Sequence, residues 1–198
     1  MSRTPDGEAA LLRRIAAKDR KAFEALYQAY YRRLFAYLFK TVRRPDMAEE
    51  VLNDVMLAVW MGAAGFDGRS RPSTWIFGIA YHKALKALDR QARQDRRAPG
   101  SAALEEQEAN GRSEPELLEE GPEGLLARRE TADVLERALR RLPLEQRTVV
   151  ELTYYHGFSY QEIAEVMSCP VNTVKTRMFH ARRRLRELLP GLGVSRAV

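Results

Sequence analysis

The chain has 198 residues, of which 45% are hydrophobic and 30% charged. This length and composition suffice for one large domain or two small ones with packed cores, and they exclude a chain that is disordered throughout. Its 33 Lys and Arg residues outnumber its 27 Asp and Glu residues, and the resulting net charge of +6 favours polyanionic partners.

Three features indicate the compartment. The single cysteine, Cys169, excludes an internal disulfide. The longest uncharged apolar run, Val55 to Phe66, is shorter than the roughly 20 residues that span a bilayer. The first residues include Asp6 and Glu8 and show no hydrophobic signal core. We therefore expect a soluble, cytoplasmic protein.

The periodicity of residues 1–97 predicts three helices. Apolar residues recur at steps of three and four from about Arg20 to Val42, and Pro45 ends this stretch. A second helix follows, with Asp46 as its expected N-cap, and a third runs from about Ser73 to Arg97. No stretch alternates like a strand, so we expect an all-α fold.

An acidic segment divides the chain. From Pro99 to Ala127 there are eight Glu residues, one basic residue and no aromatic side chain, with Pro and Gly interspersed. Such a segment cannot bury a core. We expect two small helical domains, 1–97 and 125–198, joined by a flexible acidic linker at 98–124.

The second domain carries the most specific local pattern. After a helical stretch from Leu126 to Arg141, Pro143 is expected at a first helical position and Gly157 at a helix C-cap. Ser159 and Glu162 have the spacing of a capping box. A short helix, a turn and a long helix with Pro170 at its first position then predict a helix-turn-helix.

The long final helix is expected to read DNA. Val174, Met178 and Leu185 form an inward stripe. Away from this stripe, the helix carries polar, basic and aromatic side chains of the kind that contact base edges and phosphates. They are Lys175, Thr176, Arg177, Phe179, His180 and Arg183. The alternative is a basic, solvated helix at a chain end. Cys169, in the turn, fits a small packing residue better than a redox thiol.

Motifs in both halves resemble those of a known family. Leu142 to Arg147, Gly157 to Ala164 and Thr173 to Arg177 are similar to the -35 binding domain of an extracytoplasmic-function (ECF) sigma factor of the sigma-70 superfamily. Ala48 to Val55 and Ser73 to Ala80 resemble the domain that binds polymerase and opens the -10 element. The two halves in this order are more specific than either alone.

The resemblance implies an alternative sigma factor that binds core RNA polymerase, through its clamp coiled coil and flap, and directs it to promoter DNA. An anti-sigma factor is an expected partner, and the free protein is expected to be a monomer. The polymerase-binding residues implied are Glu49, Glu50, Asn53, Asp54 and Met56. The -10 residues implied are Trp75, His82, Lys83 and Lys86. His82 stands where the family commonly has asparagine, and for Trp75 a core position is the favoured interpretation.

The acidic linker also has a role implied by this family, in which it is expected to thread the polymerase channel that later holds nascent RNA. The alternative is that the linker serves only as a soluble spacer between the two domains.

No catalytic constellation, metal site or cofactor motif is found in the sequence, so we expect no enzyme activity, no cofactor and no metal. Two rivals remain open: a helix-turn-helix regulator with a sensing or dimerising N-terminal domain, and a protein-interaction adaptor that does not bind DNA. Binding to core polymerase separates the sigma factor from both.

Overall fold

The computed structural model describes residues 5–97 and 132–189, and every regular element in these ranges is a helix. The expected all-α fold is thus confirmed, whereas the acidic linker at 98–124 lies outside the described residues. The chain divides into two compact units, one built around α1 to α4 and one around α6 to α8. None of the described helices is long and apolar enough to cross a membrane.

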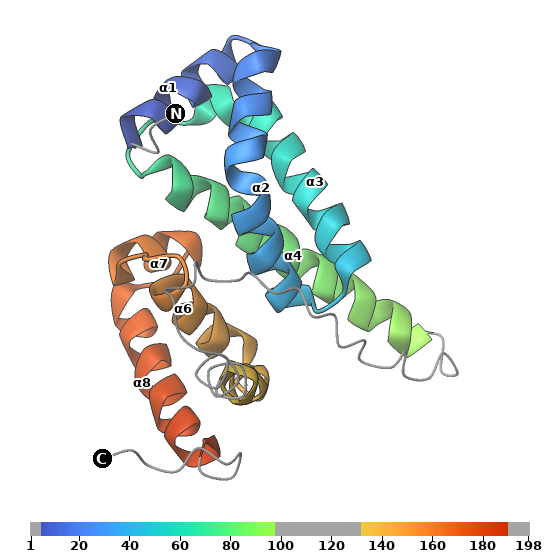
Figure 1. Cartoon of the computed structure of the whole chain (residues 1–198), viewed down its shortest axis with the longest axis vertical. Helices are drawn as coiled ribbons and strands as arrows, with labels where there is room; N and C mark the ends of the chain where they lie inside the picture. The colour runs from blue at the N-terminus through green and yellow to red at the C-terminus, as the bar shows by residue number, and fades with distance from the viewer. Residues whose placement is uncertain (1–4, 98–131, 190–198) are drawn as a thin grey trace, which may run out of the picture. The chain divides into compact units, whose positions relative to one another are not determined.

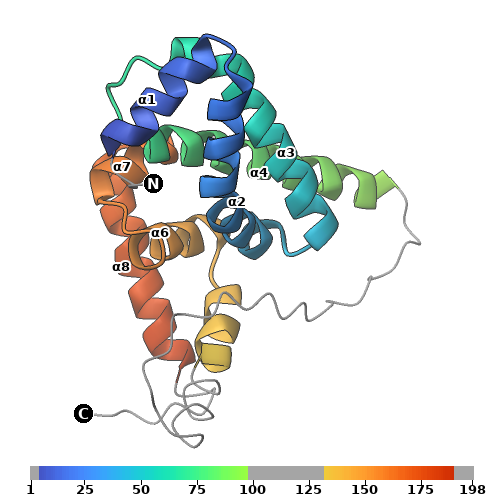
Figure 2. The ribbon, with the colours of Figure 1, turned by 45° about the horizontal axis from the view of Figure 1, so that its top comes forward.

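The N-terminal unit is a helical bundle (Figure 1). It contains α1 (Pro5–Ala16), α2 (Arg20–Val42), α3 (Pro45–Gly62), the short 3₁₀ helix η1 (Ala63–Gly65) and α4 (Pro72–Arg97). Helix α3 packs against both α2 and α4, and α1 closes the end of the bundle where η1 lies (Figure 2). The core comes from apolar faces of all four α-helices, including Leu12, Leu26, Leu34, Val55 and Ile76.

Local chemistry sets both ends of α2. Asp19 caps the start, its Oδ1 accepting from the backbone N–H of Lys21 at 2.9 Å and of Ala22 at 3.2 Å. Arg14 donates to the other carboxylate oxygen at 2.7 Å, and this hydrogen bond is the main cause of a lowered Asp19 pKa. At the other end the backbone of Arg43 is left-handed, with φ of 60°, and the Arg43 backbone N–H donates to the carbonyl of Phe39 at 2.8 Å.

The start of α3 corrects the sequence-based prediction. Arg44, not Asp46, occupies the N-cap position, and Pro45 lies inside the first turn. Proline suits this position because its missing N–H would have no helical partner there. Asp46 instead forms an ion pair with the Arg44 guanidinium, which lowers the pKa of the Asp46 carboxyl.

The C-terminal unit contains a helix at 132–140, then α6 (Leu144–Tyr154), α7 (Tyr160–Val166) and α8 (Val171–Leu188). Helix α6 packs against α8. Pro143 and Pro170 are N-cap residues with extended ψ of 146°, one position before the first helical residue where we expected them. Gly157 lies beyond the Tyr155 C-cap of α6 and has φ of +69°, a conformation that glycine adopts without strain.

The capping box before α7 is confirmed. The backbone N–H of Ser159 donates to Glu162 Oε2 at 2.8 Å, and the N–H of Glu162 donates to Ser159 Oγ at 3.3 Å. Ile163 and Ala164 behind it are buried, as are Val174 and Met178 of α8. Helix α7, the turn at Ser168 and Cys169, and α8 therefore form the expected helix-turn-helix.

Candidate DNA- and polymerase-binding surfaces

The outer face of α8 is polar and basic, with one large aromatic side chain. Opposite the buried Val174 and Met178, the helix exposes Thr176, Arg183 and Phe179, whose side chain is 63% exposed. Thr176 Oγ1 donates to the carbonyl of Asn172 at 2.9 Å, which holds the hydroxyl proton and leaves the oxygen able to accept a hydrogen bond. A helix of this width and composition fits the major groove.

The remaining predicted α8 residues lie around this face to different degrees. Lys175 is exposed on one flank, and His180 is half-buried with its ring edge-on to Phe179 at 5.5 Å between centroids. Arg177 points elsewhere: about 100° of rotation per residue turns it toward the helix-turn-helix turn, where its Nη1 lies 3.7 Å from Cys169 Sγ. The structure therefore separates Arg177 from the other five side chains.

Sequence reasoning missed an aromatic and basic cluster beside α8. Arg182 donates to the Tyr154 hydroxyl at 2.8 Å, and this hydrogen bond raises the pKa of Arg182. Tyr154 is 62% exposed, and the neighbouring Tyr155 is 51% exposed at the end of α6. Burial of its other half raises the pKa of Tyr155, with a smaller contribution from the Glu151 carboxylate. The adjacent tyrosines at the end of an expected helix were the available signal.

The outer face of α3 has the opposite charge. Glu49, Glu50, Asn53 and Asp54 are all exposed, so the structure brings four of the five predicted polymerase-binding residues onto one helix face. Met56 does not join them because its side chain is 2% exposed and packs in the core. It lies beneath the exposed face and lines a groove between α2 and α3. Its contact with polymerase stays a prediction.

Toward its C-terminal end the same α3 face becomes apolar. The predicted polymerase-binding residues did not include this part. Leu57 and Met61 are 58% and 68% exposed. They follow Asn53 and Asp54 at helical spacing, so the acidic and apolar parts form one continuous strip. Exposed large apolar side chains next to charges are typical of protein-binding surfaces.

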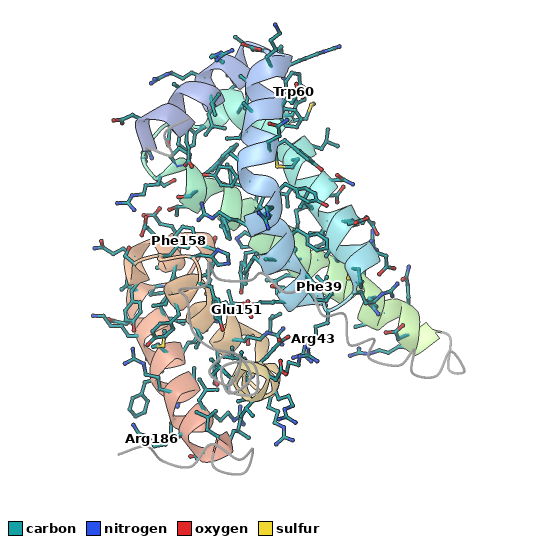
Figure 3. The ribbon with its side chains drawn as sticks, viewed as in Figure 1. Phe39, Arg43, Trp60, Glu151, Phe158 and Arg186 are labelled. Carbon is teal, nitrogen blue, oxygen red and sulfur yellow. The ribbon has the colours of Figure 1, made fainter. Side chains whose placement is uncertain are left out.

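A groove of about 550 Å³ lies between α2 and α3 beside this strip. Its walls include Phe23 and Tyr27 of α2 and Asn53, Leu57 and Trp60 of α3. The Trp60 indole packs edge-on against Phe23 at 5.2 Å between centroids, and Lys18 Nζ lies 5.2 Å from the Trp60 ring. Figure 3 shows Trp60 at the end of the α2 and α3 pair opposite to Arg43.

Helix α4 carries the residues predicted for the -10 element. Trp75, His82 and Lys86 are separated by seven and four residues, which places them on one face. His82 and Lys86 are exposed, whereas Trp75 is half-buried against Phe66 with ring centroids 5.4 Å apart. Among the described residues no group of three His, Cys, Asp or Glu side chains is placed to hold a metal ion.

The fourth predicted -10 residue has a different neighbour. Lys83 lies at the edge of the α4 face, where its Nζ is 3.6 Å from Asp54 Oδ2 of α3. One turn earlier on α3, Glu50 Oε1 accepts from Arg90 Nη2 at 2.7 Å. Two of the predicted polymerase-binding acids are therefore paired with basic side chains of α4.

Comparison with known proteins identifies both units. The family model for sigma-70 region 2 matches residues 26–94, and that for sigma-70 region 4 matches residues 132–185. The chain is 31% identical over 174 residues to the ECF RNA polymerase sigma-E factor of Haemophilus influenzae, covering 87% of this chain and 90% of the relative. It is 28% identical over 190 residues to the RNA polymerase sigma-H factor of Pseudomonas aeruginosa, covering 96% and 97%.

A solved structure agrees in fold. The sigma factor RpoE of Bartonella quintana, crystallised with the anti-sigma factor NepR, superposes with a TM-score of 0.65 at 24% identity, covering 86% of this chain and 98% of that one. The matched regions and the sequence identity carry the family assignment, and the superposition supports the two-domain helical fold. The chain belongs to the ECF sigma factors of the sigma-70 family, alternative sigma factors that direct RNA polymerase to promoters.

Proposed function

We propose that this sigma factor docks on core RNA polymerase through the outer face of α3, reads the -35 element with α8, and captures and opens the -10 element with α4. The observation that carries the proposal is the contrast between the acidic and apolar strip of α3 and the basic outer face of α8. Opposite charge selects a basic protein surface for the first and DNA for the second.

The α3 strip combines two kinds of contact. Glu49 and Asn53 supply a polar rim that steers a basic partner and sets its register. Leu57 and Met61, with the groove beside Trp60, supply an apolar surface that loses water when covered. A helical coiled coil with basic and apolar side chains, as expected of the polymerase clamp, satisfies both parts.

The α8 face supports recognition of the -35 element by direct contact with bases. Thr176 and Phe179 are short or apolar groups near the centre of the face, suited to base edges and thymine methyl groups. Arg183, Lys175 and His180 lie around them, where phosphate contacts position the helix. Arg177, turned toward Cys169, is better placed to support the turn.

The α4 face supports capture of bases from the -10 element. Unstacking a base costs a few kcal/mol, which contacts to the exposed base must offset. His82 offers one donor and one acceptor on a rigid ring, in contrast to the amide of the asparagine common in the family. We therefore expect His82→Asn to change the preferred -10 base without changing polymerase binding.

The factor has no catalytic step in this proposal, since polymerase supplies the chemistry of RNA synthesis. It acts in the cytoplasm, where polymerase and promoter are present. An anti-sigma factor as a regulatory partner is proposed by analogy with the relative crystallised in such a complex.

Co-purification tests the proposal. The full chain, tagged at its N-terminus, is mixed with purified core RNA polymerase and separated by size-exclusion chromatography. Co-elution at equal stoichiometry supports the proposal, and Leu57→Asp should reduce the co-eluting fraction while keeping the helical circular dichroism spectrum. Binding to promoter DNA without any binding to core polymerase would contradict it and favour a helix-turn-helix regulator.

A further inference from the structure

Two ion pairs join α3 to α4 on the surface of the N-terminal unit. Arg90 Nη2 lies 2.7 Å from Glu50 Oε1, and Lys83 Nζ lies 3.6 Å from Asp54 Oδ2. The hydrogen bond that Arg90 donates to Glu50 is the main cause of a raised Arg90 pKa, and the Asp54 charge contributes. The two acids are one turn apart on α3, so they form consecutive links between the same two helices.

The pairs connect groups with different partners. Glu50 and Asp54 belong to the α3 strip proposed to dock on polymerase. Lys83 and Arg90 lie along the edge of the α4 face that carries His82 and Lys86, the face proposed to bind -10 DNA. Each pair therefore neutralises one group needed by polymerase and one suited to DNA phosphates.

The pairs are easily broken, as a linkage requires. The side chains of Glu50 and Arg90 are 58% and 57% exposed, and those of Asp54 and Lys83 are 55% and 38% exposed. Ion pairs at such exposure contribute little to stability, because water and salt screen them. The buried contacts between α3 and α4 hold the helices together without them.

We propose that Glu50 and Asp54 are positioning residues that link polymerase binding to -10 DNA binding. In the free protein the two acids pair with Arg90 and Lys83 and thereby lower the affinity of the protein for DNA. When a basic polymerase surface takes over the two carboxylates, the cations are released for the DNA backbone. The linkage is reciprocal, so bound DNA strengthens polymerase binding by the same factor, about twofold to fivefold for each pair. The inference rests on the proposed function of the two surfaces.

The first test measures affinity for purified core polymerase by fluorescence anisotropy of the labelled full chain. Arg90→Gln frees Glu50, so we expect binding to tighten twofold to fivefold. Arg93→Gln removes the same charge three residues further along the exposed end of α4 and breaks no ion pair among the described residues, so binding should not change. Equal effects of the two variants would overturn the linkage.

The second test measures binding of the free protein to fluorescent single-stranded DNA of mixed sequence. Glu50→Gln should raise affinity twofold to fivefold because it releases Arg90. Glu24→Gln removes one exposed acid from α2 of the same unit without breaking an ion pair among the described residues. It should give a smaller gain. In the Arg90→Gln background the gain from Glu50→Gln should fall to that of Glu24→Gln, and a gain that persists there would overturn the proposal.

A separate result distinguishes failure of the proposed surfaces. If Lys86→Gln left binding of the holoenzyme to -10 DNA unchanged, or if the wild type did not bind core polymerase, the proposed function would be wrong. If Lys86→Gln weakened binding of the holoenzyme to -10 DNA and the wild type bound core polymerase, the proposed function would stand. If Glu50→Gln and Arg90→Gln then behaved as their controls, only the linkage would be wrong.

Discussion

Helices α3 and α8 are each 18 residues long and are buried on one face, yet their outer faces differ in sign. That of α3 is acidic and then apolar, whereas that of α8 is basic with one exposed aromatic ring. The buried faces determine which helices form and how they pack. The exposed faces carry the proposed choice of partner, a basic protein surface for α3 and DNA for α8.

The largest expected effect is the loss of -35 binding by α8 alone. Ile163→Ala removes a fully buried side chain from behind the helix-turn-helix, and such truncations cost about 2 to 5 kcal/mol. We expect the C-terminal unit to unfold at lower denaturant and -35 binding to be lost, with core polymerase binding through α3 retained. Urea unfolding and gel-shift assays measure the two effects. Loss of polymerase binding in equal measure would contradict the separate roles of the helices.

The next largest effect is a loss of polymerase binding by α3 alone. Leu57→Asp places a carboxylate in the apolar part of the strip without disturbing the core, because Leu57 is 58% exposed. We expect polymerase affinity to fall about 10-fold to 100-fold, as for other central apolar interface residues. Ala29→Asp adds the same charge at an exposed position of α2 and should have little effect. Similar losses in both variants would indicate a general charge effect.

A third prediction sharpens the role of α8. Thr176→Ala should change which -35 sequences are preferred, by about 1 to 3 kcal/mol at one base pair. Arg183→Ala should weaken all sequences similarly and reduce the salt dependence of binding by about one unit of slope. Selection from a randomised -35 library and salt titrations test the pair. If both variants lose affinity equally on every sequence, the assignment of base and phosphate contacts is wrong.

The smallest expected effect concerns the support of α2, on which the α3 strip depends. The Asp19 pKa is lowered, mainly by Arg14, so its charged form stabilises the folded state. This contribution is present above the unfolded pKa of about 3.9 and is lost as pH falls through the lower folded value. Asp19→Ala should therefore unfold at a lower temperature than wild type at pH 7, with a difference that shrinks at acidic pH. A difference independent of pH would contradict this.

Local patterns predicted much of the fold. The spacing of apolar residues located α2 at Arg20 to Val42, and the Ser159 and Glu162 pair located the start of α7, because both signals act within a few residues. The prolines at 143 and 170 were misplaced by one position, since proline is compatible with both the N-cap and the first turn.

The surfaces were harder to predict, because exposure depends on how helices pack. Met56 was assigned to the α3 surface and is buried, whereas Leu57, the next residue, is exposed. The Glu50 and Arg90 pair joins residues 40 positions apart, so no local pattern indicates it. The orientation of Arg177 toward Cys169 likewise follows from the packing of the turn.

The central claim is that this chain gives core RNA polymerase promoter specificity through both DNA-facing helices. Run-off transcription with purified core polymerase on a library randomised at the -35 and -10 elements tests it directly. We expect transcripts only when the factor is added, from templates that share one -35 and one -10 sequence, with Thr176→Ala changing the first alone and His82→Asn the second alone. Transcription that does not depend on the factor, or that shows no sequence preference at either element, would contradict the claim.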